Sequence, residues 1–79
     1  MPKYIKFQIY ETVYSVTKIN DDGSALQVRL FSGKPVIEFF DEVLDAWSTH
    51  VETTKEEFID FYQKVNTMIL RIIKKGMLS

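Results

Sequence analysis

The chain has 79 residues and no cysteine, so it is long enough for one small domain and cannot form a disulfide. Its 46% hydrophobic and 14% aromatic residues are typical of a folded chain rather than a disordered one. The missing cysteines also exclude thiol catalysis and cysteine-based zinc sites. We therefore expect residues 1–79 to form a single folded domain.

The sequence predicts neither a membrane span nor a targeting segment. The longest uninterrupted apolar run is three residues, at positions 68–70, whereas a membrane-spanning helix needs ~20. The first residues lack the long apolar stretch behind a basic start that marks a signal peptide. We expect a cytoplasmic location and no membrane partner.

Three strands are predicted in the first part of the chain, at residues 3–10, 12–19 and 25–31. Ile5, Phe7 and Ile9 alternate with polar or amphipathic residues, which is the period of a half-buried strand. The Asp22-Gly23 dipeptide between the second and third strands is a hairpin signal, because glycine adopts positive φ at low cost. We expect an antiparallel three-stranded sheet with one buried face.

A first helix is predicted at residues 35–48. Val36, Phe40, Val43, Leu44 and Trp47 recur at the spacing of one helical stripe. Residues 36–40 alone also fit a short fourth strand, and this alternative stays open. The helix is favoured because the stripe continues as far as Trp47.

A second helix is predicted at residues 54–75. Thr54 and Glu57 have the spacing of a capping box, apolar residues then recur at helical spacing, and Gly76 is a typical stop signal. The expected fold class is therefore α+β, with a three-stranded antiparallel sheet (β-β-β) followed by two α-helices packed on one sheet face.

No motif for catalysis, metal binding or cofactor binding is present. The chain has no glycine-rich phosphate loop, and His50 is its only histidine, so no second residue marks a hydrolytic or metal site. We expect a protein that is not an enzyme and that binds no metal and no cofactor.

Charge is distributed unevenly along the chain. Residues 35–62 hold eight acids and one base, whereas residues 63–79 hold four bases and no acid. On the predicted first helix, one face would carry Glu38, Asp41, Glu42 and Asp45. This acidic face is either the solvated side of the helix or a docking surface for a basic protein. Some small phage and mobile-element inhibitors use acidic faces as nucleic-acid decoys, and by that analogy the partner would be a nucleic-acid-binding protein.

The second predicted helix has more apolar residues than one stripe needs. Ile59, Leu70 and Met77 lie off its main seam, and apolar residues wrap much of the circumference around Met68 and Ile73. A helix that is apolar nearly all round lies in a core or in an interface. These five residues therefore form a candidate surface for a partner or for homo-oligomerisation.

The leading hypothesis is a non-enzymatic interaction or regulatory domain that binds a protein partner through the acidic face and the apolar second helix. The alternative is a small nucleic-acid-binding domain. In that alternative the outer sheet face presents Tyr4, Lys6, Tyr10 and Arg29, because aromatic residues interleaved with bases can stack on and neutralise single strands.

Overall fold

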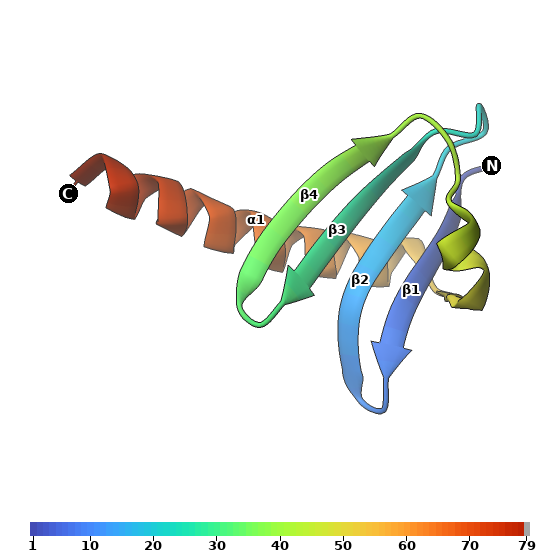
Figure 1. Cartoon of the computed structure of the whole chain (residues 1–79), viewed down its shortest axis with the longest axis horizontal. Helices are drawn as coiled ribbons and strands as arrows, with labels where there is room; N and C mark the ends of the chain where they lie inside the picture. Colours follow the sequence, from blue (N-terminus) through green and yellow to red (C-terminus); the bar gives the residue numbers. More distant parts are fainter. Residues whose placement is uncertain (79) are drawn as a thin grey trace.

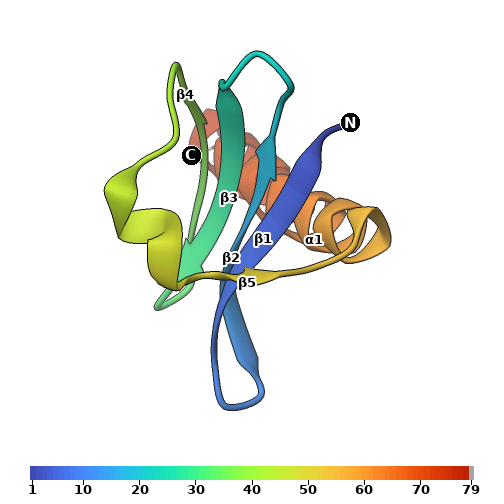
Figure 2. The same cartoon turned by 90° about the vertical axis from the view of Figure 1, so that its right-hand side faces the viewer.

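The computed structural model describes residues 1–78, which form an antiparallel sheet of five strands, a short 3₁₀ helix and one long α-helix. Four strands follow one another as hairpins: β1 (Lys3–Ile9), β2 (Thr12–Ile19), β3 (Ala25–Phe31) and β4 (Lys34–Phe40). The 3₁₀ helix η1 (Asp45–Thr49) and the short strand β5 (Val51–Glu52) lead to helix α1 (Lys55–Leu78). The strand order is β4-β3-β2-β1-β5; Figure 1 shows β4 to β1 side by side, and β5 is labelled in Figure 2. The predicted α+β class is confirmed.

The two faces of the sheet are covered by different elements, α1 on one and η1 on the other (Figure 2). Under α1, Val16 and Val28 of the sheet pack against Phe58 and Val65, and three of these four side chains are fully buried. On the opposite face Trp47 of η1 covers a smaller cluster. The members of that cluster are Ile5, Ile19, Ala25 and Phe40. The prediction that helices pack on a single face is therefore wrong.

The predicted helix at residues 35–48 is also wrong, and the alternative strand at residues 36–40 is confirmed as part of β4. Ser32 and Gly33 both have positive φ, at 50° and 76°, which makes the two-residue turn that joins tightly paired strands. Residues 36–40 are mostly β-branched or aromatic and fit a pleated sheet. The helical spacing that continues to Trp47 arises by chance, because its residues belong to strand β4, to the loop after it and to the 3₁₀ helix η1.

Helix α1 begins where the sequence predicts and ends later. The hydroxyl of Thr54 accepts a hydrogen bond of 3.1 Å from the backbone N–H of Glu57, so Thr54 caps the helix. Gly76 does not stop it, because a single glycine inside a helix costs only about 1 kcal/mol relative to alanine. The helix therefore continues beyond the predicted end at residue 75.

Candidate interaction surfaces

The C-terminal part of α1 projects beyond the sheet (Figure 1). We call residues 70–77 the overhang and residues 55–69 the anchored half. Four apolar side chains of the overhang are 51–80% exposed; they are Leu70, Ile72, Ile73 and Met77. In the anchored half, Phe58 is 7% exposed and Val65 is fully buried. One helix thus combines a core segment with an apolar segment that nothing within residues 1–78 covers.

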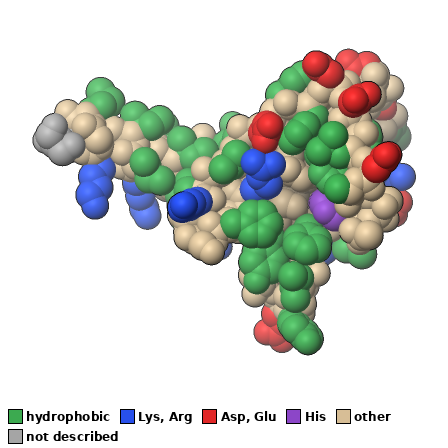
Figure 3. All heavy atoms as spheres, in the orientation of Figure 1, with side chains coloured by type: hydrophobic (Ala, Val, Ile, Leu, Met, Phe, Trp, Pro, Cys, Tyr) green, Lys and Arg blue, Asp and Glu red, His purple; other side chains and the backbone are tan. Residues whose placement is uncertain are grey.

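The overhang carries two apolar stripes and a basic side. Ile72 continues the seam of Val65 and Ile69 that packs on the sheet, whereas Leu70, Ile73 and Met77, which we call the lateral stripe, lie on the next side of the helix. Arg71, Lys74 and Lys75 occupy the remaining arc. Figure 3 shows apolar atoms along the upper side of the projecting helix and cationic ones below it. The overhang is therefore amphipathic, with a broad apolar arc.

The five residues predicted as an apolar interface are only partly brought together. Leu70, Ile73 and Met77 form the lateral stripe, whereas Ile59 lies near the other end of α1 and is 39% exposed. Met68 is half-buried and lies on the opposite flank of the helix, beside Lys64 and Arg71. The sequence pattern indicated that α1 has more apolar residues than its packing needs, but it did not show where the sheet would end beneath the helix.

The acidic helix face does not exist, because its four carboxylates lie on three different elements. Glu38 is on β4, where its carboxylate lies 3.0 Å from the Arg29 guanidinium. Asp41 and Glu42 follow β4 in a loop, and Asp45 begins η1. The three loop and η1 acids are exposed and lie next to the exposed side chains of Val43 and Leu44. A role for these acids in partner binding stays a prediction, without the regular helical spacing.

The residues of the predicted nucleic-acid surface are separated as well. Tyr4 and Lys6 lie beneath α1, since the Tyr4 ring lies 5.5 Å from that of Phe58 and Lys6 Nζ lies 2.8 Å from Glu57 Oε1. This ammonium lowers the pKa of Glu57. Tyr10 is 94% exposed at the tip of the β1–β2 hairpin. Of the four residues, only Arg29 belongs to the open part of the opposite sheet face.

An aromatic cluster that the sequence reasoning missed occupies that open face. Tyr14 stacks on Phe31 with ring centroids 5.3 Å apart, and Phe7 lies 6.0 Å from Tyr14. A β-bulge opposite Phe7 and Gln8 places Tyr14 and Ser15 on the same face, so strict alternation fails there. No feature of the sequence between Val13 and Ser15 indicates this bulge.

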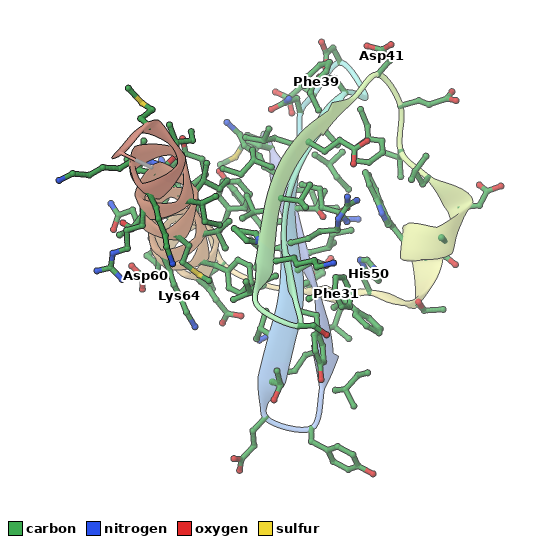
Figure 4. All side chains as sticks on the ribbon, turned by 60° about the vertical axis from the view of Figure 1, so that its left-hand side comes forward. Phe31, Phe39, Asp41, His50, Asp60 and Lys64 are labelled. Atoms are coloured by element: carbon green, nitrogen blue, oxygen red, sulfur yellow. The ribbon has the colours of Figure 1, made fainter. Side chains whose placement is uncertain are left out.

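A pocket of about 330 Å³ lies between this aromatic cluster and η1, and it is lined by residues that include Phe7, Gln27, Arg29, Phe31, Trp47 and His50. Arg29 donates a hydrogen bond of 3.0 Å to Gln27, which donates one of 3.3 Å to Thr17. Figure 4 shows His50 and Phe31 on the side of the sheet away from α1. Within residues 1–78 the buried Nδ1 of His50 has no hydrogen-bond partner, and burial lowers the pKa of its imidazole.

Residues 1–78 contain no group of three or more histidine, cysteine, aspartate or glutamate side chains placed to hold a metal ion. Among these residues no helix is long and apolar enough to cross a membrane.

No protein-family model matches the chain, and comparisons with curated proteins and with solved structures gave no match either. Its surfaces are therefore the basis for any functional proposal.

Proposed function

We propose that the chain is a non-enzymatic protein-interaction domain with a regulatory role, and that the overhang is its main binding surface. The observation that carries this proposal is the exposure of 51–80% at Leu70, Ile72, Ile73 and Met77 on a helix that projects from the sheet. Contiguous exposed apolar surface of this kind marks interaction sites, because leaving it in water is unfavourable.

The form of the overhang also supports a protein partner. Leu70, Ile73 and Met77 are spaced by three and four residues, which aligns them along one side of a helix. An apolar helical stripe of this spacing fits a groove or the matching stripe of another helix. The loop acids Asp41 and Glu42 would add attraction to a basic partner and speed its association.

The proposal is tested by capture from an extract of the native host, followed by affinity measurement with each purified partner. We expect the double variant Leu70→Glu/Ile73→Glu to weaken binding at least tenfold, because it places charge in the apolar contact. Lys74→Gln is the matched control on the basic side of the overhang, and it should change the affinity less than threefold. If the unmodified chain, the double variant and Lys74→Gln bind the partner with equal affinity, the overhang is not the interface.

A second candidate function is the binding of single-stranded nucleic acid on the open sheet face. It is favoured by one observation, the Phe7–Tyr14–Phe31 ring cluster beside Arg29. The Glu38 carboxylate beside Arg29 counts against it. A mobility-shift assay at low salt decides: this function predicts binding that falls steeply with salt and is lost in Tyr14→Ala/Phe31→Ala, and no shift at low salt would eliminate it.

A further inference from the structure

We infer that the partner of the overhang is a second copy of this chain, joined edge to edge through β4 in a two-fold symmetric dimer. This inference rests on the proposed function, since it assigns a partner to the surface proposed there. It is carried by three features: an open strand edge, an overhang that extends past that edge, and an exposed phenylalanine on the edge strand.

The first feature is the free edge of β4, the outermost strand of the sheet. Phe31 of β3 and Lys34 of β4 flank a two-residue turn and form the first hydrogen-bonded pair of this hairpin. Every second residue of β4 from Lys34 on therefore directs its N–H and C=O groups toward β3. Ile37 and Phe39 therefore turn their N–H and C=O groups outward. These groups are ready to pair with another strand.

The second feature is the length of α1 relative to the sheet. A helix of 24 residues is about 36 Å long, whereas five strands spaced ~4.8 Å apart span about 19 Å between their outer axes. The overhang of about 12 Å leaves room beneath it for two to three further strands. Ile72 extends the sheet-packing seam into that space. Strands added beside β4 would therefore find an apolar cover already in place.

The third feature is Phe39, which is 60% exposed although its position opposite Leu26 places it on the α1 side of the sheet. Figure 4 shows it at the upper end of β4, next to Asp41. A two-fold axis perpendicular to the sheet would put both helices on one face and antiparallel. Each overhang would then cover the partner's Phe39, and the two lateral stripes of Leu70, Ile73 and Met77 would face each other.

Charge selects the register of the strand pair. With Ile37 opposite the partner's Ile37, Lys34 lies diagonal to the partner's Glu38 on the face away from α1. A register centred one residue later would set Glu38 opposite the partner's Glu38, which is unfavourable. Pro35 has no N–H, so the favoured register forms about four inter-strand hydrogen bonds instead of about six.

The size of the interface predicts a dimer of moderate strength. Seven residues of β4 and eight of the overhang give about 15 residues a side, below the 20–30 of a standard interface, so we expect a dissociation constant in the micromolar range. Of the three bases on each overhang, Lys74 borders the lateral stripe, so pairing the two stripes brings like charges closer together. Salt screens this repulsion, so added salt should tighten the dimer.

Light scattering and sedimentation of the whole chain from about 1 to about 500 μM test the inference. We expect a monomer–dimer transition that shifts to lower concentration when salt is raised. Leu70→Glu/Ile73→Glu should move the transition at least tenfold higher, and Lys74→Gln should move it slightly lower. A strict monomer over the whole range overturns the inference, as does a dimer that Leu70→Glu/Ile73→Glu leaves unchanged.

A cysteine probe tests the strand pairing separately, because the chain has no cysteine of its own. Hydrogen-bonded partners in antiparallel strands have Cα atoms about 5.5 Å apart, within reach of a disulfide. Ile37→Cys should therefore give a disulfide-linked dimer under mild oxidation. The control Val51→Cys, on β5 at the opposite edge of the sheet, should not. Linkage through Cys at position 51 but not at 37 overturns the β4 pairing.

The outcomes also separate this inference from the proposed function. A strict monomer that binds a different protein, with loss in Leu70→Glu/Ile73→Glu, overturns the dimer and supports the overhang as a binding surface. If those two substitutions change neither self-association nor partner affinity, both proposals fail.

Discussion

The two halves of α1 have similar apolar residues but very different surroundings. The anchored half is capped by Thr54, paired through Glu57 to Lys6 of β1, and packed on the sheet through Phe58 and Val65. The overhang presents Leu70, Ile72, Ile73 and Met77 to solvent at 51–80% exposure. The position of the sheet edge, rather than the helix sequence, separates a core segment from a candidate interface.

This contrast makes different demands on the two halves. The anchored half stabilises the fold through burial, since apolar area removed from water contributes ~25 cal/mol per Å². The overhang gains little of that stabilisation in an isolated chain, and eight helical residues without packing are marginal in water. Substitutions should therefore affect stability in one half and association in the other.

The largest expected effect tests this division directly. Phe58→Ala removes a ring that is 7% exposed, and it should lower the free energy of unfolding by about 3–5 kcal/mol. Ile73→Ala, at a site that is 51% exposed, should change it by less than about 0.5 kcal/mol. Denaturant unfolding of dilute protein measures both. A loss above about 2 kcal/mol in Ile73→Ala would show that the overhang is packed in the monomer.

A smaller effect is expected at the helix start. Thr54→Ala leaves the N–H of Glu57 without its 3.1 Å acceptor and should cost about 1 kcal/mol. Thr54→Ser keeps the hydroxyl, and serine caps helices at least as well as threonine, so this substitution should leave the free energy of unfolding nearly unchanged. Since Thr54 caps the anchored half, the loss should appear in global unfolding. If Thr54→Ala and Thr54→Ser unfold alike, the cap contributes nothing and packing alone fixes the start of α1.

The regular parts of the fold were predictable from local sequence signals. Alternation located β1 to β3, and the capping box located the start of α1. The helix predicted at residues 35–48 was wrong because its apolar residues match a helical stripe by chance. Pairing with β3, rather than this local spacing, makes residues 34–40 a strand. Non-local strand pairing overrides a local period, and only the tight turn at Ser32 and Gly33 pointed to it.

The candidate surfaces were less predictable, for a different physical reason. The excess of apolar residues on α1 predicts an interface, and this stays a prediction; which of these residues are exposed depends on where the sheet ends. The ring cluster of Phe7, Tyr14 and Phe31 depends on a β-bulge that reverses the alternation within β2. The assignment of Tyr4 and Lys6 to an outer surface failed because α1 packs on the face that they share. Alternation cannot show which of two partly buried faces the helix will cover.

Gly76 offers a way to stabilise the overhang alone. A Cβ at this position would meet no atom within 4 Å, so Gly76→Ala should fit the helix and favour it locally by up to about 1 kcal/mol. Hydrogen exchange of the amides around residue 76 should slow severalfold, while global unfolding changes by less than about 0.5 kcal/mol. If the free energy of global unfolding rises by the full ~1 kcal/mol, the anchored half and the overhang unfold as one unit.

The smallest expected effect concerns the ion pair that holds the anchored half to β1. Lys6 lowers the pKa of Glu57, so the pair contributes stability that is fully present above the unfolded-state pKa, near 4.5. This contribution is lost as the pH falls through the lower pKa of the folded state. Since the Glu57 side chain is 38% exposed, solvent screening limits it to a few tenths of a kcal/mol.

Denaturant unfolding from pH 7 to pH 3 measures this contribution in Glu57→Gln. The variant should lose that small amount at pH 7 and should differ progressively less from the unmodified chain below about pH 4.5. Glu56→Gln, at the exposed neighbouring position, is the matched control. Identical pH profiles for the two variants would mean that burial and the Thr54 cap, without the ion pair, distinguish the anchored half from the overhang.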